Sequence, residues 1–171
     1  NALLAGIYDD THSFSIRGVS KETFEIAAEL IGKGGEIDVI AEKINTYSEQ
    51  ILSAVKVVVN NLKFDKKDKY AYTYISRDIY EFLEMDGMRM DTVMNLIIDI
   101  LLGREGYRWG FLIRPDGEKS TKVSLRARTG AQNVRKIAEG LGGGGHDEAA
   151  GANFPDVEGS FEAVARVRKA V

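Results

Sequence analysis

The 171-residue sequence contains no cysteine, two histidines and two prolines. Without cysteine, the chain forms neither disulfides nor thiolate metal sites, and it has no thiol nucleophile. No apolar run approaches the roughly 18–20 residues that a membrane-spanning helix needs. The first residues lack the basic region of a secretory signal peptide. We therefore expect a globular protein without membrane partners, and the absence of cysteine fits a reducing compartment.

Positive charge is concentrated in one part of an otherwise acidic chain. The net charge is −3, yet the segment 104–136 carries nine Lys and Arg residues against three acids. Such a basic patch suits a short polyanion. A solvated face of a sheet explains the same composition, and the charge pattern alone favours that simpler reading.

Four consecutive glycines form the most unusual stretch of the sequence: Gly142, Gly143, Gly144 and Gly145. His146 follows directly, and Asp147-Glu148-Ala149-Ala150 is typical of the start of a helix. Bare backbone N–H groups, a helix N-terminus and an imidazole together predict a binding site for phosphate. The alternative is a helix C-cap followed by a surface loop, which one glycine would satisfy. Four glycines in a row favour the anion site.

Apolar periodicity predicts an alternation of helices and strands. The helices are expected at 20–32, 37–44, 48–62, 77–83, 91–102, 133–141 and from Ser160 to the end of the chain. The strands are expected at 3–8, 70–75, 107–114, 119–128 and 151–154, with a turn at 115–117 and a loop at 86–90.

Within these elements, Ser20 and Ser160 are expected as helix N-caps, and Phe161 is expected on the inner face of the last helix. In the strand at 119–128, alternation places Arg126 and Arg128 on one polar face with Ser124. Tyrosines 70, 72 and 74 share one face of their strand. They suit either stacking on nucleobases or packing in a half-buried sheet, and packing is the commoner case.

Three stretches resemble motifs of one enzyme family, in that family's order. The run from Gly142 to Gly151 (Gly-Gly-Gly-Gly-His-x-x-Ala-Ala-Gly) resembles the signature of the DHHA1 domain, and Lys122–Arg128 resembles the strand before it. The stretch Gly6–Phe14 (Gly-Ile-x-x-Asp-Thr-x-x-Phe) resembles the last metal-site motif of the DHH domain. The chain is thus similar to DHH/DHHA1 phosphoesterases, and most similar in pattern to the nanoRNA/pAp phosphatases.

The resemblance implies an α/β fold and a division of the chain. Residues 1–47 would be the C-terminal remnant of a DHH catalytic domain, a βαα tail. Residues 48–69 would form a connector helix and a linker, with the charged tract 63–69 as the boundary between two domains. Residues 70–171 would be the DHHA1 substrate-binding domain, a mixed β-sheet flanked by helices.

The resemblance also implies a function. Members of this family hydrolyse short oligoribonucleotides and pAp as exonucleases and phosphatases with two manganese ions. Asp10 matches a metal ligand, whereas the Asp-His-His motif is absent from the sequence. We therefore expect the chain to be the C-terminal portion of such a hydrolase, inactive by itself and without bound Mn²⁺. It would supply the half that grips substrate phosphate.

The substrate-binding residues follow from the same motifs. The glycines from Gly142 to Gly145 would donate N–H groups to phosphate, Arg126 would pair with phosphate, and His146 would hydrogen-bond it. Arg128 lies at a variable position and ranks lower. Two alternatives stay open: a non-catalytic RNA- or nucleotide-binding module, and part of a cyclic-dinucleotide phosphodiesterase. The Ala-Ala-Gly ending and the absence of sensor segments disfavour the second. The sequence leaves a homodimer open.

Overall fold

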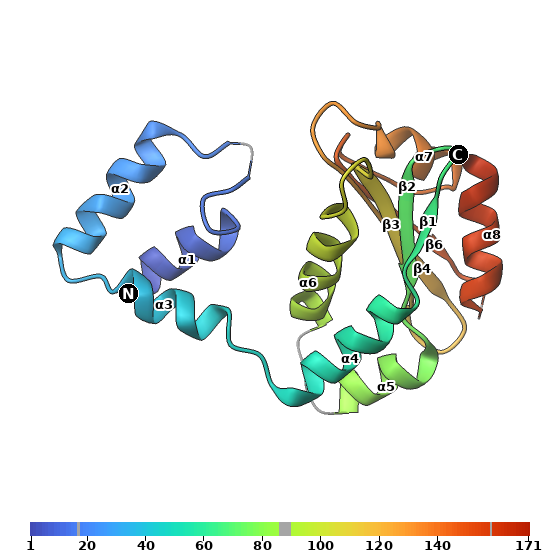
Figure 1. Cartoon of the computed structure of the whole chain (residues 1–171), viewed down its shortest axis with the longest axis horizontal. Coiled ribbons are helices and arrows are strands. Elements are labelled where there is room, and N and C mark those ends of the chain that lie inside the picture. The colour runs from blue at the N-terminus through green and yellow to red at the C-terminus, as the bar shows by residue number, and fades with distance from the viewer. Residues whose placement is uncertain (17, 86–89, 158) are drawn as a thin grey trace. The chain divides into compact units, whose positions relative to one another are not determined.

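In the computed structural model, the chain forms two compact units, Asn1–Ser48 and Glu49–Val171 (Figure 1). The structure describes residues 1–16, 18–85, 90–157 and 159–171. A six-stranded mixed sheet with helices on both faces confirms the predicted α/β class. Within the described residues, no helix is both long enough and apolar enough to cross a membrane.

The first unit consists of three helices, α1 (Ala2–Asp10), α2 (Lys21–Gly32) and α3 (Ile37–Ile44). One residue from each helix, Leu4, Ala27 and Ile40, forms its buried centre. The N-cap of α2 is confirmed, since Ser20 Oγ accepts a hydrogen bond from the Thr23 backbone N–H at 3.3 Å. Around this small centre much apolar surface stays accessible, and more than half of the Phe24 side chain is exposed.

The predicted strand at 3–8 is wrong, because these residues lie in α1. The first unit is therefore an ααα arrangement and not the expected βαα tail. A short apolar run fits a strand and a buried helical turn equally well by periodicity. Here no neighbouring strand is present among the described residues of the unit, whereas a helix satisfies its backbone hydrogen bonds internally. The helical spacing also directs Leu4 and Tyr8 toward the same core.

The second unit is built on one sheet with the strand order β1-β2-β3-β4-β6-β5. The strands are β1 (Lys63–Asp65), β2 (Tyr70–Tyr74), β3 (Trp109–Pro115), β4 (Thr121–Ala127), β5 (Gly144–Gly145) and β6 (Ala149–Phe154). Strands β2 and β3 run parallel, and the other neighbouring pairs are antiparallel. The hairpin predicted around the 115–117 turn is confirmed as β3 and β4, with Trp109 opposite Ala127.

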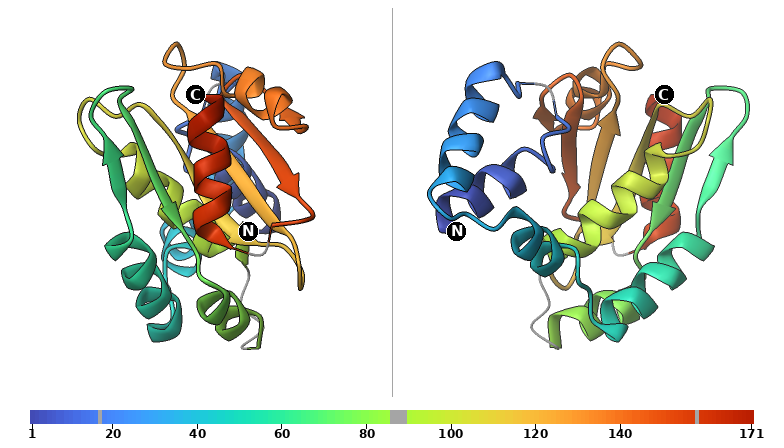
Figure 2. Two further views of the ribbon diagram at one scale, coloured as in Figure 1. Left: turned by 90° about the vertical axis from the view of Figure 1, so that its right-hand side faces the viewer. Right: turned by 60° about the vertical axis from the view of Figure 1, so that its left-hand side comes forward.

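Helices cover both faces of this sheet (Figures 1 and 2). On one face, α7 (Val134–Gly140) and α8 (Ser160–Ala170) pack against an aromatic core that includes Tyr70, Trp109 and Phe111. On the other face, α4 (Glu49–Asn60), α5 (Arg77–Met85) and α6 (Met90–Leu102) pack over Leu112 and Ile75. The tyrosines of β2 take part in this packing: the rings of Tyr72 and Phe111 stack at 5.2 Å.

The segment expected as connector and linker is an integral part of the second unit. Helix α4 buries Ala54 and Val58 against the sheet, and Thr73 Oγ1 donates a 2.6 Å hydrogen bond to the Val58 carbonyl. The charged tract 63–69 forms β1 and the turn that leads into β2. The apolar side of α4 explains the difference, since such a stripe is stable in water only against another element.

Helix α8 turns a different face to the sheet than the sequence predicts. Ala163 and Val167 are fully buried, whereas Phe161 is 80% exposed. The sheet here already carries large aromatic rings, so small side chains fill the remaining space. Gly159, not Ser160, occupies the N-cap. Of the predicted loop at 86–90, residues 86–89 lie outside the described residues, and Met90 begins α6.

Candidate functional site

A pocket of about 520 Å³ lies between α6 and the sheet face formed by β4, β6 and β5. Its size is in the range of small-molecule sites. The sheet side contributes Arg114, Asp116, Lys122, Ser124, Arg126, Gly144, Ala149, Ala150 and Gly151, and the helix side contributes Tyr80, Met90, Met94, Asn95 and Ile98.

Strand β4 supplies the polar floor of the pocket through the two-residue period of a strand. Val123, Leu125 and Ala127 are buried in the core on the far face. Lys122, Ser124 and Arg126 therefore point to the opposite face, and all three line the pocket. This confirms the alternation predicted for β4, and it brings Arg126 into the pocket.

Two glycines lie beside Ser124 in the same row of the sheet. Ser124 is opposite Gly151 of β6, and Gly151 is opposite Gly144 of β5. Neither glycine has a side chain to fill the space above the floor. A ligand can thus approach the backbone of β5 and β6 closely.

The other glycines of the run serve the packing of β5 against β6. A Cβ atom on Gly143 would lie 2.1 Å from the Gly151 carbonyl oxygen, and one on Gly145 would lie 2.6 Å from that of Ala149. Such distances exclude any larger residue unless the backbone moves. Gly142 has a φ of +80° where the chain leaves α7. A Cβ on Gly144 meets no atom within 4 Å, because this residue faces the open pocket.

The helix predicted after the glycine run is absent, which corrects one part of the phosphate-site argument. Residues 146–149 form a tight turn in which the His146 N–H donates to the Ala149 carbonyl at 2.8 Å, and β6 follows. The N–H groups of Gly142 and Gly143 donate to carbonyls of α7, Glu139 and Ala138. They are not offered to the pocket. The expectation of a helix failed because the small residues at 149–151 fit equally well in β6, a strand that lies between β4 and β5.

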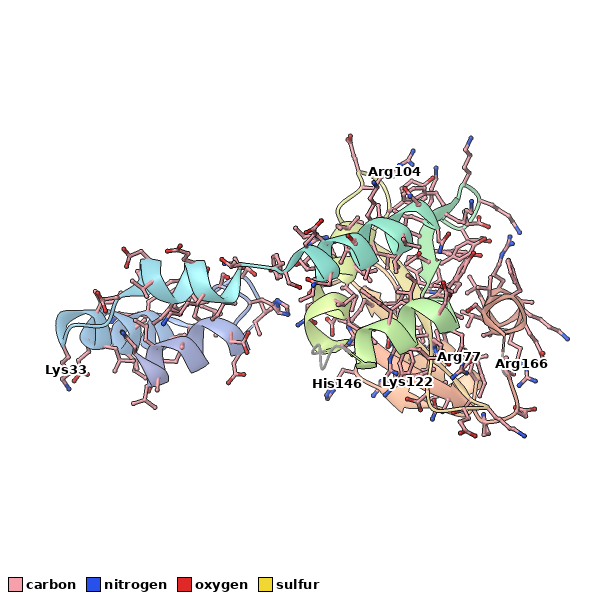
Figure 3. The ribbon with its side chains drawn as sticks, turned by 90° about the horizontal axis from the view of Figure 1, so that it is seen from below. Lys33, Arg77, Arg104, Lys122, His146 and Arg166 are labelled. Carbon is pink, nitrogen blue, oxygen red and sulfur yellow. The ribbon has the colours of Figure 1, made fainter. Side chains whose placement is uncertain are left out.

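His146 lies outside the pocket lining. It is exposed on the turn between β5 and β6, and its side chain projects into solvent (Figure 3). Of the substrate-binding residues predicted from the motifs, Arg126 and Gly144 line the pocket. Gly145 belongs to β5, and Gly142 and Gly143 lie between α7 and β5; none of the three lines the pocket.

The charges in the pocket are only partly balanced. Arg114 pairs with Asp116 at 3.3 Å, and the Asn153 amide donates to the same carboxylate at 2.9 Å. Among the described residues, Arg126 donates to the neighbouring Leu125 carbonyl alone, at 2.9 Å. Neither Arg126 nor Lys122 forms an ion pair with any described residue. Two uncompensated cations therefore face the pocket.

The Arg126 guanidinium is partly buried. Burial lowers the pKa of its guanidinium, because desolvation destabilises the charged form. A buried charge is stable only when paired. An anion in the pocket would supply the missing partner and could accept two parallel hydrogen bonds from the guanidinium.

The opposite wall has a different chemistry. Met94 and Ile98 lie on the face of α6 that points into the pocket, with Tyr80 of α5 nearby, and Asn95 adds an amide. This wall offers apolar surface, and its Asn95 amide both donates and accepts hydrogen bonds. A ligand with an anionic end and a planar, partly apolar end matches the two walls.

The sequence indicated only one of these walls. Lys122 and Arg114 belong to the basic segment of the sequence, and the motifs predict Arg126 as a phosphate-binding residue. The sequence does not indicate Asn95 or Met94 as pocket residues. The apolar pattern of a helix does not show which of its residues will face a pocket beside the sheet.

Arg128 and Asp10 lie apart from the pocket. Arg128 follows β4 and donates to the Leu102 carbonyl at 3.3 Å, at the end of α6. Asp10 is the last residue of α1 in the first unit, beside a separate depression of about 360 Å³ that Thr11 and Glu22 also line.

The described residues do not fit the two-metal site that the family resemblance implies. They include no cluster of three or more carboxylates and imidazoles that could hold a metal ion. Asp10 alone cannot supply the converging donors that a pair of divalent cations needs.

Comparison with known proteins gives one family match, to the DHHA1 domain over residues 67–171. The chain is 30% identical over 151 residues to the bifunctional oligoribonuclease and PAP phosphatase NrnA of Mycoplasma genitalium, covering 88% of the chain and 44% of NrnA. It is 28% identical over 170 residues to the cyclic-di-AMP phosphodiesterase GdpP of Bacillus subtilis, covering 99% of the chain and 24% of GdpP.

A solved structure shows the same fold. An exopolyphosphatase-related protein from Bacteroides fragilis aligns with a TM-score of 0.79 and 28% identity, over 96% of this chain and 46% of that protein. The chain spans about a quarter to a half of the length of the curated relatives it matches.

The family match covers more than half of the chain, and the relatives named above extend over nearly all of it. The resemblance inferred from the three motifs is therefore confirmed. The chain belongs to the DHH/DHHA1 family of phosphoesterases, and residues 67–171 form its DHHA1 domain.

Proposed function

We propose that the Glu49–Val171 unit binds a phosphorylated nucleotide in the pocket between α6 and the sheet. The observation that best supports this proposal is the state of Arg126. Its guanidinium is half-buried in the pocket and forms no ion pair with any described residue. Lys122 adds a second unpaired cation on the same strand face, and Ser124 lies between the two. A phosphate would rest on this floor, and the base would lie against Met94 and Ile98 with its edge near Asn95.

The whole protein, on this proposal, is a hydrolase of phosphate esters that acts on short oligoribonucleotides or pAp. Support comes from relatives named as oligoribonucleases and PAP phosphatases. In this arrangement the DHHA1 half selects a terminal phosphate, because charge-assisted hydrogen bonds favour a dianionic end over an interior diester. Exonuclease action, dependence on manganese and a cytoplasmic location belong to the same proposal.

A second substrate class has its own support. Relatives named as cyclic-di-AMP phosphodiesterases match the chain over 91–99% of its length at 28–30% identity. A cyclic dinucleotide has no terminal phosphate, so it would offer Arg126 only diester oxygens.

Calorimetric titration of the full chain with pAp tests the proposed binding. Arg126→Ala should weaken binding by about 1.5–3 kcal/mol, roughly 10- to 100-fold, through loss of a charge-assisted pair. Arg126→Lys keeps the charge but loses the planar fork, so it should restore only part of the affinity. Arg128→Ala is the matched control: it removes the same charge two residues away and outside the pocket, and should change affinity less than threefold.

Equal losses in Arg126→Ala and Arg128→Ala would show that only the overall positive charge matters, and would contradict the pocket. Parallel titrations with cyclic di-AMP decide between the substrate classes. Tighter binding of pAp supports the oligonucleotide and pAp assignment. Tighter binding of the cyclic dinucleotide supports the second class.

A further inference from the structure

A second basic surface lies outside the pocket, at the end of the sheet where β1 and β4 end and β2 and β3 begin. Three segments meet there: the β1–β2 hairpin, the loop between α6 and β3, and the chain that follows β4. They carry seven exposed cations, which we call the basic edge: Lys63, Lys66, Lys67, Lys69, Arg104, Arg108 and Arg128.

These cations are poorly compensated. Asp65, in the hairpin, is engaged by Arg168 at 3.3 Å and by the backbone N–H groups of Lys67 and Asp68. Asp68 and Glu105 are the remaining acids on the three segments. No member of the basic edge forms an ion pair with a residue that the structure describes. On an ordinary solvated surface of an acidic protein, positive and negative side chains would be interspersed.

Contacts between the segments make the basic edge one continuous surface. The Arg128 N–H donates to the Arg108 carbonyl at 2.8 Å, which joins the chain after β4 to the chain before β3. The Arg104 guanidinium lies 4.2 Å from the ring centroid of Phe64 in β1 and 5.1 Å from that of Tyr107. The Lys69 ammonium lies 5.8 Å from the Tyr107 ring.

The basic edge begins where the pocket ends. Arg126 is in the pocket, and Arg128 is the next residue on the same face of the strand by the two-residue period. From β4 the edge crosses β3 and β2 to β1, three strand spacings or about 14 Å. Figure 3 shows Arg104 on the opposite side of the second unit from Lys122 and His146, so the surface leads away from the pocket.

We propose that the basic edge binds the downstream nucleotides of a single-stranded RNA whose terminal phosphate occupies the pocket. This inference rests on the proposed function of the pocket. Spaced cations follow a phosphate backbone, and the planar guanidinium of Arg104, supported by Phe64, offers a surface on which a base can stack. A globular acidic partner would not use the stacking surface, which favours nucleic acid.

The test compares ligands of different length on the full chain, with a chelator present to prevent cleavage. The probes are pAp and 5′-phosphorylated oligoadenylates of two, three and five nucleotides. The variant is the double substitution Lys66→Ala, Lys67→Ala, at two exposed positions of the hairpin turn. The control is Lys21→Ala, Lys33→Ala, which removes the same charge from the first unit.

The wild-type chain should gain affinity with length, and the hairpin variant should lose about fivefold or more for the pentanucleotide with pAp unchanged within twofold. The control variant should match the wild type. The slope of log affinity against log salt for the pentanucleotide should fall by about one in the hairpin variant.

Two results would overturn the basic edge as a binding surface. One is a wild-type affinity that does not rise with length. The other is a hairpin variant that binds the pentanucleotide as well as the wild type does. Failure of the pocket is distinguishable, because it would abolish pAp binding in the wild type while the hairpin variant still weakened binding of the pentanucleotide. Circular dichroism melts show whether each variant is folded.

Discussion

At the scale of single residues, the pocket depends on where glycine is required and where it leaves space. Gly143 approaches the backbone of β6 so closely that even a methyl group meets the Gly151 carbonyl. Gly144, the next residue, faces open space above the pocket floor. Two adjacent glycines of one run therefore have different roles, one in folding and one in access.

This difference predicts that alanine substitutions at the two adjacent glycines change the stability of the protein by different amounts. Gly143→Ala should lower the free energy of unfolding by about 1–3 kcal/mol or more, because the added Cβ forces β5 away from β6. Gly144→Ala should leave stability within about 0.5 kcal/mol. Urea unfolding followed by circular dichroism measures both. Equal destabilisation by the two substitutions would contradict the described register of β5 and β6.

How much of the site the sequence predicts depends on the residue. Arg126 follows from the strand period alone, because apolar Val123 and Leu125 fix the face on which the arginine must lie. Asn95 does not, since periodicity shows that α6 has an apolar side without showing which part extends past the sheet into a pocket. The glycine run predicts an anion site, whereas the structure places Gly143 and Gly145 against β6 of the same chain.

At the scale of elements, α8 provides the clearest test of the packing. Its buried face is made of small residues, Ala163 and Val167, against an aromatic sheet surface. Val167→Ala should destabilise the protein by about 1.5–3 kcal/mol through lost burial and a cavity. Phe161→Ala, which removes a much larger but exposed side chain, should cost less than about 0.5 kcal/mol.

Thermal and urea unfolding of the two variants decide the orientation of α8. A larger loss of stability in Phe161→Ala than in Val167→Ala would show that Phe161 is buried, as the sequence predicts. That expectation failed because size and hydrophobicity alone favour burial of a phenylalanine, whereas the opposing surface sets how much volume is available.

The β1–β2 hairpin gives the protein an acid-sensitive element. Hydrogen bonding from the Asp68 N–H, followed by further contributions from Lys67 and Arg168, lowers the pKa of the Asp65 carboxyl below its ordinary value of 3.8. A carboxyl whose pKa is lower in the folded than in the unfolded state contributes stability above the unfolded pKa. This stability is lost as the pH falls through the folded pKa.

We therefore expect Asp65→Asn to destabilise the protein near neutral pH and to have a diminishing effect as the pH falls below 3.8. Melting temperatures of the wild type and the variant, measured from about pH 6 to about pH 2, test this. A constant difference across that range would mean that the ionised carboxylate contributes nothing to the hairpin.

At the scale of the whole molecule, the proposed function makes this chain the phosphate-binding half of the enzyme. The described residues lack a cluster of metal donors, and the curated relatives are two to four times longer. Incubated with manganese and a dinucleotide, the chain should release no mononucleotide above a protein-free blank. The Mycoplasma genitalium NrnA protein is the positive control. Robust manganese-dependent release by this chain would contradict the division of labour.

The large-scale features followed from the sequence to different degrees. The three motifs led to the correct family, and turn residues fixed the β3–β4 hairpin. Leu3–Tyr8 was misassigned because a six-residue apolar run carries too little periodicity to distinguish strand from helix. The charged composition of the tract 63–69 is typical of a linker. A hairpin turn at the edge of a sheet has the same composition, and this is what the tract forms.

We propose that a phosphorylated nucleotide binds between α6 and the β4–β6–β5 face. A titration of the ¹⁵N-labelled chain with pAp, followed by two-dimensional NMR, tests this binding most directly. The largest shifts of backbone amides should occur at Ser124, Arg126, Gly144 and Gly151, with Asn95 across the pocket. Shifts concentrated instead around Leu141, Phe154 and Arg166, which line a separate surface groove beside α8, would contradict it.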